Sequence, residues 1–220
     1  MFIGHVGVGI GAKFLVPRVS LGTTLLASML LDLLWPAFLL TGLEQVKILP
    51  GSTRITPLSF TEYPFSHSLL AVFGWAAAFA IAHYLVRRNR KEAWICGALV
   101  LSHWLLDLLV HRPDLQIVPG FAKRVGLGIW NNLTLTLVIE LTIFAVGIVL
   151  YCYTTKPADK TGSIGFSGML VFLLVLYFAN IFGPPPPNPE VIAWTGMASW
   201  LFIIWGFWIE RHRTLRWLYN

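Results

Sequence analysis

About six apolar stretches divide this chain, and each is long enough to cross a lipid bilayer as a helix. A spanning helix needs about 20 mostly apolar residues, because the bilayer core holds no water to hydrogen-bond an open backbone. The chain is 56% hydrophobic and 12% charged, whereas soluble domains carry about 25% charged residues. The sequence therefore predicts an all-α, polytopic membrane helical bundle. The predicted spans are residues 20–41, 66–86, 93–111, 129–153, 163–183 and 191–209.

The first residues of the chain are apolar but too few to cross a bilayer unaided. Glycines let two membrane helices approach closely, so we expect residues 2–16 to form a short N-terminal half-helix packed against a neighbour. Lys13 follows this apolar start rather than preceding it, which is not the order of a cleavable signal peptide. We treat residues 1–220 as a single integral membrane domain. The glycines of the half-helix are Gly4, Gly7, Gly9 and Gly11.

The basic residues predict the surroundings and the orientation of the bundle. The net charge is +6, and Lys and Arg gather in short clusters between apolar stretches, as at residues 87–91. This distribution is typical of membrane topology signals, so we expect lipid partners and no nucleic acid. With residues 87–91 in the cytoplasm, most Lys and Arg lie inside and the C-terminal tail is cytoplasmic. The long connections 42–65 and 112–128 then lie on the outer side, where loops most often carry function.

Three ionisable side chains interrupt the apolar stretch 93–111. His103, Asp107 and His111 are spaced four residues apart, so they share one face of a helix. A carboxylate at the centre of a membrane helix costs roughly 2.5–3.5 kcal/mol, and imidazoles beside it add to that cost unless something binds them. A divalent metal ion would do so, because neutral imidazole and carboxylate are both good metal ligands.

Further polar residues lie at similar depths in other stretches. A helix rises about 1.5 Å per residue, which puts Asp32, His67 and Glu140 in the middle and outer half of the bilayer. His5 approaches the same level if the first residues form a half-helix. Asp32 and Glu140 each continue a polar stripe at four-residue spacing. One shared cluster is therefore geometrically possible.

Each of these residues also has a structural interpretation. A His103–Asp107 pair can be a hydrogen bond that holds helices together, and Asp32 can be a helix-packing contact. Ser66 can be only a helix cap, with His67 at the membrane interface.

His111, His5 and Glu140 also have structural interpretations. His111 lies at the membrane edge, where a histidine needs no special explanation, and His5 stands alone. Glu140 can be a partner of a ligand, a base, a ligand or an interhelical hydrogen bond. We interpret His83 and His212 as structural.

The candidate ligands supply nitrogen and oxygen but no sulfur. Cys96 and Cys152 are far apart and lack the spacing of a zinc-binding or disulfide framework. Nitrogen and oxygen ligands suit zinc, our first choice, or manganese or iron(II). There are more candidates than the four ligands of a closed structural zinc site, which favours an open position for water or a second ion. The expected cofactor is a divalent metal, as one or two ions.

Several of these residues resemble the pattern of a known family. Over roughly residues 1–120 the chain resembles the bacterial membrane-bound metal-dependent hydrolases, also described as YdjM-like or LexA-binding inner-membrane hydrolases. The part of the chain at 129–209 is similar only as three further membrane helices. The resemblance implies a bacterial inner membrane and a set of metal ligands. The matching features are His5 near the start, Asp32 in the following span, His67-Ser68 at a helix start and His103-x-x-x-Asp107. The implied ligands are His5, Asp32, His67, His103 and Asp107.

A membrane-bound, metal-dependent hydrolase is the leading functional hypothesis. Metal-activated water would attack an ester or phosphoester of a lipid-like substrate, and Glu140 or His111 would transfer protons. Arg112, Lys123 and Arg124 would hold a phosphate or lipid head group at the outer rim, although interfacial anchoring also explains them.

Two other classes of function remain open. The first is a transporter or channel for metal ions or protons, since intramembrane His, Asp and Glu also form ion relays. It calls for polar residues that continue to the inner face, but the inner halves of 93–111 and 129–153 are mostly apolar, which favours a closed pocket. The second is a non-catalytic membrane scaffold in which the polar residues only bond helices.

Overall fold

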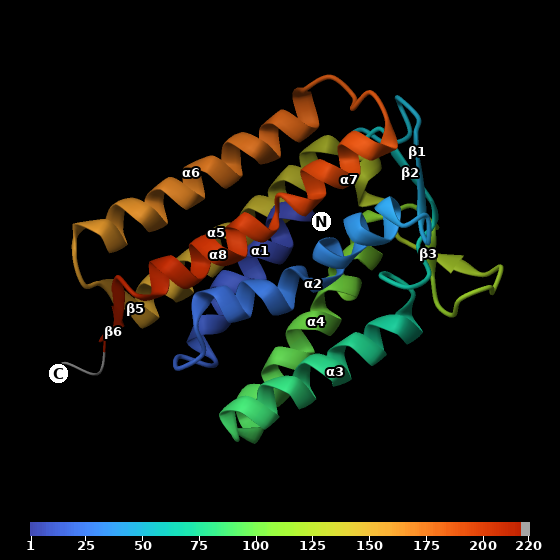
Figure 1. Cartoon of the computed structure of the whole chain (residues 1–220). Coiled ribbons are helices and arrows are strands. Elements are labelled where there is room, and N and C mark those ends of the chain that lie inside the picture. The colour runs from blue at the N-terminus through green and yellow to red at the C-terminus, as the bar shows by residue number, and fades with distance from the viewer. Residues whose placement is uncertain (217–220) are drawn as a thin grey trace.

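Six helices of the described residues are long and apolar enough to cross a membrane, which confirms the predicted all-α bundle and an integral membrane protein. The computed structural model describes residues 1–216. The helices lie side by side, with their short connections and one small strand pair at one end and longer loops with strands at the other (Figure 1). The spans are α2 (Leu21–Leu40), α3 (Leu69–Arg87), α4 (Arg90–Val110), α5 (Leu133–Thr154), α6 (Lys160–Phe182) and the pair α7 (Pro189–Met197) with α8 (Trp200–Glu210).

Polar side chains set where the spanning helices begin. A side-chain oxygen before the first turn accepts a hydrogen bond from one of the backbone N–H groups that lack a partner within the helix. Helix α3 begins after Ser68, whose hydroxyl accepts from the Ala71 backbone N–H. Ser66 is therefore not the cap of this helix and is free for other contacts. The capping residues of the spanning helices are Ser20, Ser68, Asn89, Asn132, Asp159 and Asn188.

The N-terminal segment forms the short helix α1 (Phe2–Gly11), followed by the 3-10 turn η1 (Ala12–Phe14). Helix α1 lies inside the bundle between α2 and α5 (Figure 1). A Cβ atom on Gly7 would lie 2.7 Å from the Cα atom of Phe144, so only glycine permits this approach. The predicted close-packing half-helix is confirmed, and it carries His5 into the interior.

The final span was predicted as one helix over 191–209 but contains a tightened turn. Backbone N–H groups of Ser199, Leu201 and Phe202 bond the carbonyls three residues earlier rather than four. Just before this turn, Gly196 packs against Pro36 of α2, where a Cβ atom would lie 2.5 Å from the proline ring. The predicted span is confirmed, and only its tightened turn was not predicted, because a run of apolar residues does not reveal a local change in helical pitch.

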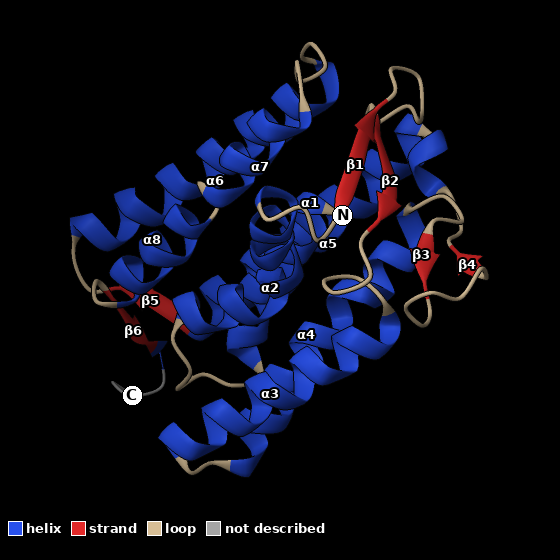
Figure 2. Ribbon diagram, turned by 45° about the vertical axis from the view of Figure 1, so that its right-hand side comes forward, coloured by secondary structure: helices blue, strands red, loops and turns tan. Residues whose placement is uncertain are grey.

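The long loops carry strands that the sequence analysis did not predict. Strands β1 (Gln45–Ile48) and β2 (Leu58–Glu62) form an antiparallel hairpin over one end of the bundle (Figure 2). The next outer loop contains β3 (Leu115–Gln116) and β4 (Arg124–Val125), followed by the 3-10 turn η2 (Ile129–Asn131). We call this the loop end. At the opposite end, which we call the basic end, β5 (Thr155–Pro157) pairs with β6 (Arg213–Leu215).

Helix α2 joins two apolar cores and presents a polar stripe between them. One core includes Leu25, Met29 and Leu33 of α2 with residues of α1, α5, α6 and α8. The other includes Leu31 and Trp35 of α2 with residues of α3, α4 and the β1–β2 hairpin. At 100° per residue, the stripe made by Thr24, Ser28 and Asp32 falls between these two faces. The helical spacing thus directs the polar stripe to the seam of the bundle.

Candidate metal centre

Two carboxylates and two imidazoles from three parts of the fold meet at this seam. His103 Nε2 lies 3.2 Å from Asp107 Oδ2 and 3.5 Å from Asp32 Oδ1. His67 Nε2 lies 3.6 Å from Asp32 Oδ1 and 3.7 Å from Asp107 Oδ2. Asp32 comes from α2, His67 from the turn before α3, and the other two residues from α4. We call this group the four-atom cluster.

The four carboxylate-to-imidazole distances of the four-atom cluster are those of neighbouring ligands in a tetrahedral site. Ligands at about 2.0–2.1 Å from a tetrahedral zinc lie about 3.3–3.4 Å from one another. The carboxylate-to-imidazole distances in the cluster, between 3.2 and 3.7 Å, bracket that value. Asp32, His67 and His103 place their ligand atoms within 4.8 Å of one another. These spacings are those expected of side chains that hold a divalent cation.

The hydrogen bond on the far side of the His103 ring fixes which nitrogen faces the cluster. Nδ1 lies 2.8 Å from the backbone carbonyl of Ser28, so Nδ1 carries the proton and donates a hydrogen bond to that oxygen. Nε2 is then the nitrogen with the lone pair. It is buried, has no hydrogen-bond partner among the described residues, and faces two carboxylates. The lone pair of Nε2 and the negative carboxylate oxygens repel one another unless a proton or a metal ion lies between them. Metal-binding histidines are oriented in the same way, with the other ring nitrogen donating to a carbonyl.

His67 is oriented by a chain of hydrogen bonds. Its Nδ1 atom lies 2.7 Å from Ser66 Oγ, and the same hydroxyl lies 2.7 Å from Glu44 Oε2. Because the hydroxyl donates to the carboxylate, it accepts from His67 Nδ1–H, and Nε2 faces the cluster with its lone pair. Glu44 also accepts hydrogen bonds from the backbone N–H groups of Phe65 and Ser66. This buried carboxylate thus holds the His67 turn in place.

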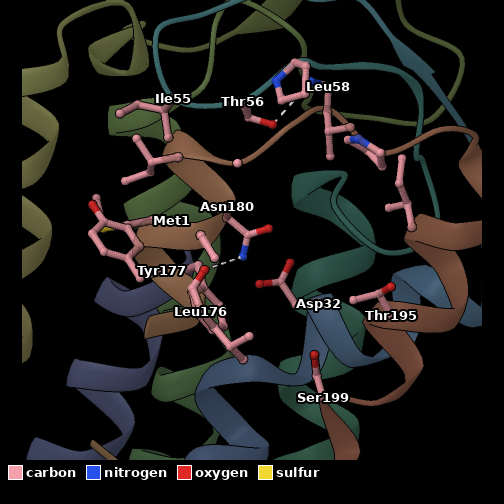
Figure 3. A pocket seen from close by; sticks show the side chains of 18 of the residues that line it. Met1, Asp32, Ile55, Thr56, Leu58, Leu176, Tyr177, Asn180, Thr195 and Ser199 are labelled. Atoms are coloured by element: carbon pink, nitrogen blue, oxygen red, sulfur yellow. Dashed lines mark hydrogen bonds between the residues drawn. The ribbon is translucent and has the colours of Figure 1, made fainter. Parts of the chain in front are cut away.

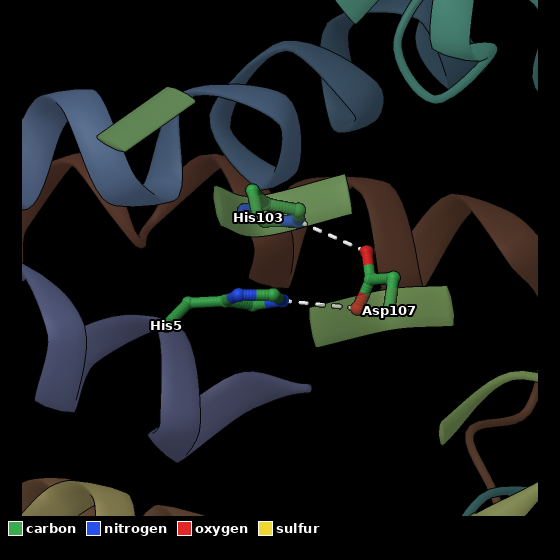
Figure 4. Close-up of side chains that lie close together, drawn as sticks. All are labelled: His5, His103 and Asp107. Carbon is green, nitrogen blue, oxygen red and sulfur yellow. Dashed lines mark hydrogen bonds and ion pairs between the residues drawn. The ribbon is translucent and has the colours of Figure 1, made fainter. Parts of the chain in front are cut away.

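The second oxygen of Asp107 faces a different group of nitrogens. His5 Nε2 lies 3.0 Å from Asp107 Oδ1, and the α-amino group of Met1 lies 2.6 Å from the same oxygen. Figure 4 shows His5 and His103 reaching opposite oxygens of this carboxylate. The two imidazole rings stack with centroids 3.5 Å apart. His5, His103 and Asp107 form a second group with metal-ligand spacing, which shares His103 and Asp107 with the four-atom cluster.

His111 lies next to this second group and is held by a carboxylate of its own. Its Nε2 atom is 3.8 Å from Asp107 Oδ1, while its Nδ1 atom is 3.0 Å from Asp114 Oδ1. The Tyr63 hydroxyl donates to the same Asp114 oxygen over 2.9 Å. Burial and the nearby Asp114 raise the pKa of the Tyr63 hydroxyl well above its usual range, so it remains a donor at neutral pH. An imidazole oriented in this way is suited to proton transfer.

Glu140 lies near the first residues of α1 rather than in the four-atom cluster. Its buried carboxylate interacts with the backbone N–H groups of Ile3 and Gly4, which have no partner within the helix. A negative charge at a helix N-terminus is favourable, so Glu140 helps to place α1 and with it His5. Its Oε2 atom has no hydrogen-bond partner among the described residues and remains available.

A cavity of about 940 Å³ opens beside these side chains. Asp32, His67, Asp107, His111 and Glu140 all contribute to its wall. Figure 3 shows Asp32 reaching into it from α2, with Asn180 of α6 and Thr195 of α7 on other sides. Binding cavities for small molecules have volumes of about 300–1,000 Å³, so the space is large enough for a substrate.

The basic residues expected at the rim lie outside this cavity. Arg112 donates to the Ser59 hydroxyl over 3.1 Å and lies 3.9 Å from Asp114. Arg124 forms an ion pair of 2.9 Å with Glu62. Lys123 is exposed in the loop between β3 and β4. None of these three residues lines the cavity, whereas Arg54 does.

Four residues at the site were not predicted from the sequence, namely Glu44, Tyr63, Asp114 and Arg54. Glu44 is 22 residues from Ser66 and Tyr63 is 51 residues from Asp114, so no local spacing links them. Asp114 did offer a signal, because it follows His111 by three residues just after a helix end. His83 and His212 lie outside the cluster, where they pair with Glu92 and Asp159.

The comparisons with known proteins assign no relative. Searches against family models, curated proteins and solved structures all gave no match. The resemblance noted in the sequence therefore stays a prediction, and the arrangement of the side chains carries the functional argument.

Proposed function

We propose that this protein is a membrane-bound, metal-dependent hydrolase acting on an ester or phosphoester of a lipid-like substrate. The observation that carries the proposal is the four-atom cluster, in which each imidazole nitrogen lies 3.2–3.7 Å from an oxygen of both Asp32 and Asp107. Zinc is the first choice of metal, with manganese or iron(II) as alternatives, because the ligands are nitrogen and oxygen. When bound, the ion would supply Lewis-acid activation of water and of the scissile group.

The side chains around the cluster have separate roles in this proposal. Asp32, His67, His103 and Asp107 hold the ion. His5 is the predicted ligand that stands apart from them, on the other oxygen of Asp107, where it would bind a second ion or orient that carboxylate. One or two ions are therefore compatible with the arrangement.

His111 is the proposed general base and acid. It lines the cavity beside Asp107, and Asp114 holds its ring from the opposite side. The pair can accept a proton from water during attack and return it to the leaving oxygen. Glu140 remains a second proton acceptor on the cavity wall, although its contacts with α1 favour a positioning role.

A closed pocket supports hydrolysis better than transport. The cavity and its charged lining lie toward the loop end, while α1, α2, α5, α6 and α8 share an apolar core. Along α2 toward the basic end, the hydroxyls of Thr24 and Ser28 are bonded to carbonyls of their own helix. An ion path would need polar groups through that core. By the distribution of Lys and Arg, we propose that the loop end faces away from the cytoplasm, that the C-terminal tail is cytoplasmic, and that the membrane is a bacterial inner membrane. Residues 217–220 of that tail lie outside the described residues.

Hydrolysis of a panel of lipid esters and phosphoesters by the purified protein in nanodiscs tests this proposal. The parent should release product, and His111→Gln should be slower by about 100- to 10,000-fold while it keeps its bound metal. His83→Gln is the matched control, because His83 pairs with Glu92 far from the cavity. Uptake of zinc into sealed vesicles, lost in His103→Ala, together with no hydrolysis, would replace the proposal by a transporter.

A further inference from the structure

The cavity beside the cluster has one apolar side that reaches the membrane-facing surface. Phe172 of α6 and Leu201 of α8 line it, although 47% and 65% of their surfaces are exposed. Leu176, Phe202 and Trp205 continue this side toward the interior. Because both helices are spanning segments, the surface between them contacts lipid chains. An apolar tail can therefore enter the cavity from the side without passing through water.

The roof of the cavity carries a cation without a carboxylate partner. Arg54 lies in the turn between β1 and β2, and its side chain is exposed, with no hydrogen bond or ion pair among residues 1–216. Its backbone N–H donates to the Trp130 carbonyl over 3.0 Å. The Trp130 ring in turn lies 4.3 Å from the His111 ring. Arg54 and His111 thus both contact Trp130 and both line the cavity.

The contrast with neighbouring cations makes Arg54 distinctive. Arg112 and Arg124 each have a carboxylate partner, Asp114 and Glu62 respectively. A guanidinium group that remains unpaired at the mouth of a cavity attracts anions and recognises phosphate oxygens well.

We propose that the cavity binds an amphiphile with an anionic, phosphate-type head and an apolar tail, with Arg54 at the head and the α6–α8 surface at the tail. The head lies between Arg54 and His111, and the tail leaves past Phe172 and Leu201. This assignment rests on the proposed function only for which group reacts; binding itself does not depend on hydrolysis.

Binding of tritiated dodecylphosphonate to the purified protein in phosphatidylcholine nanodiscs tests whether Arg54 binds the anionic head group. The C–P bond of this probe resists hydrolysis. Arg54→Ala should weaken binding about tenfold, because a charge-assisted hydrogen bond is lost, and should leave dodecanol binding unchanged. Lys47→Ala is the matched control, since Lys47 is exposed on the same hairpin but does not line the cavity. Equal effects of the two variants would overturn the assignment of the head.

A second pair of variants tests whether the apolar tail lies at the α6–α8 surface. Leu201→Trp should weaken binding of both dodecylphosphonate and dodecanol, because the larger ring fills the lateral opening. Ile204→Trp is the control, because 62% of Ile204 is exposed on the same helix and it does not line the cavity. Thr195→Trp, at another lining position, should repeat the effect if Leu201→Trp fails to fold. Unchanged binding in both lining variants would overturn the lateral site, and so would methylphosphonate that competes as well as dodecylphosphonate.

The outcomes separate this inference from the proposed function. Metal content is measured in the same samples. If the protein holds no metal but still binds dodecylphosphonate in a way that depends on Arg54, only the hydrolase proposal is removed. If metal and hydrolysis persist while the three lining variants Arg54→Ala, Leu201→Trp and Thr195→Trp bind the probe like the parent, the present inference alone is removed.

Discussion

The two ends of this bundle pair ionisable groups in opposite ways. At the basic end, each acid meets a donor: Lys13 pairs with Glu210, and His212 lies 2.8 Å from Asp159. At the loop end, the four-atom cluster brings two carboxylates to the lone-pair side of His103 and His67. The first arrangement is complete within the chain, whereas the second needs a proton or a metal ion between the imidazole nitrogens and the carboxylates.

This difference between the two ends distinguishes ionisable groups that stabilise the fold from those that bind a ligand. A buried carboxylate satisfied by a protein donor needs nothing else, and removal of its partner destabilises the fold. A carboxylate that faces the lone pairs of oriented imidazoles destabilises the protein until an ion is bound. Changes at the loop end should therefore act on metal binding, and changes at the basic end should act on stability.

The largest expected effect follows removal of a group in the four-atom cluster. His103→Ala or Asp107→Asn should weaken zinc binding by more than about 100-fold, because even partners outside the ligand sphere typically contribute 10–100-fold. Competition with a chromogenic chelator measures the dissociation constant. His83→Ala, which removes a histidine nearer the basic end, should bind zinc like the parent.

The next effect concerns the chain that orients His67. Glu44→Gln and Ser66→Ala should each weaken zinc binding about 10–100-fold while stoichiometry stays unchanged. Both side chains contact His67 or its turn without touching the cluster. The same competition assay reports the change. Affinity equal to that of the parent in both variants would show that this hydrogen-bond chain is only structural.

A stability effect without a metal effect is expected at the basic end. Lys13→Met removes the partner of Glu210 and a donor to the Val19 carbonyl, which lies 2.7 Å from Nζ. The free energy of unfolding should fall by about 1–3 kcal/mol, the cost of leaving a buried polar group without its partner. Denaturation in detergent, followed by fluorescence, measures this loss. A change in zinc affinity of the same variant would break the separation of the two ends.

The smallest effect is a pH dependence at the exposed pair of the basic end. The hydrogen bond from His212 holds the pKa of Asp159 below its usual value. A lowered carboxylate pKa stabilises the folded state above the unfolded pKa of about 3.9, and this contribution is lost as the pH falls through the folded pKa. His212→Ala should therefore melt slightly earlier than the parent at pH 7, and the difference should vanish in acid. A difference that grows as the pH falls would contradict this assignment.

The sequence predicts the membrane bundle well because its signals are local. Apolar runs set the spans, and the glycines of the first residues indicated the close approach that Gly7 makes to α5. The turn between α7 and α8 and the short strands were missed, because they depend on contacts such as that of Gly196 with Pro36.

The candidate site was predictable only in its ionisable residues. Four-residue spacing placed His103 beside Asp107, and depth along the helices made a meeting with Asp32 and His67 plausible. The partners that orient them could not be predicted, since Glu44 reaches His67 through a loop and a hydroxyl. The rim cations were chosen from charge alone, and the structure instead places Arg54 on the cavity.

X-ray absorption spectroscopy of the zinc-loaded protein tests the central claim most directly. We predict stoichiometric zinc with only nitrogen and oxygen ligands at about 2.0–2.1 Å. Imidazole scattering from His67 and His103 should be visible, and the signal should be lost in Asp107→Asn. A protein that binds no stoichiometric metal, or a sulfur shell at about 2.3 Å, would contradict it.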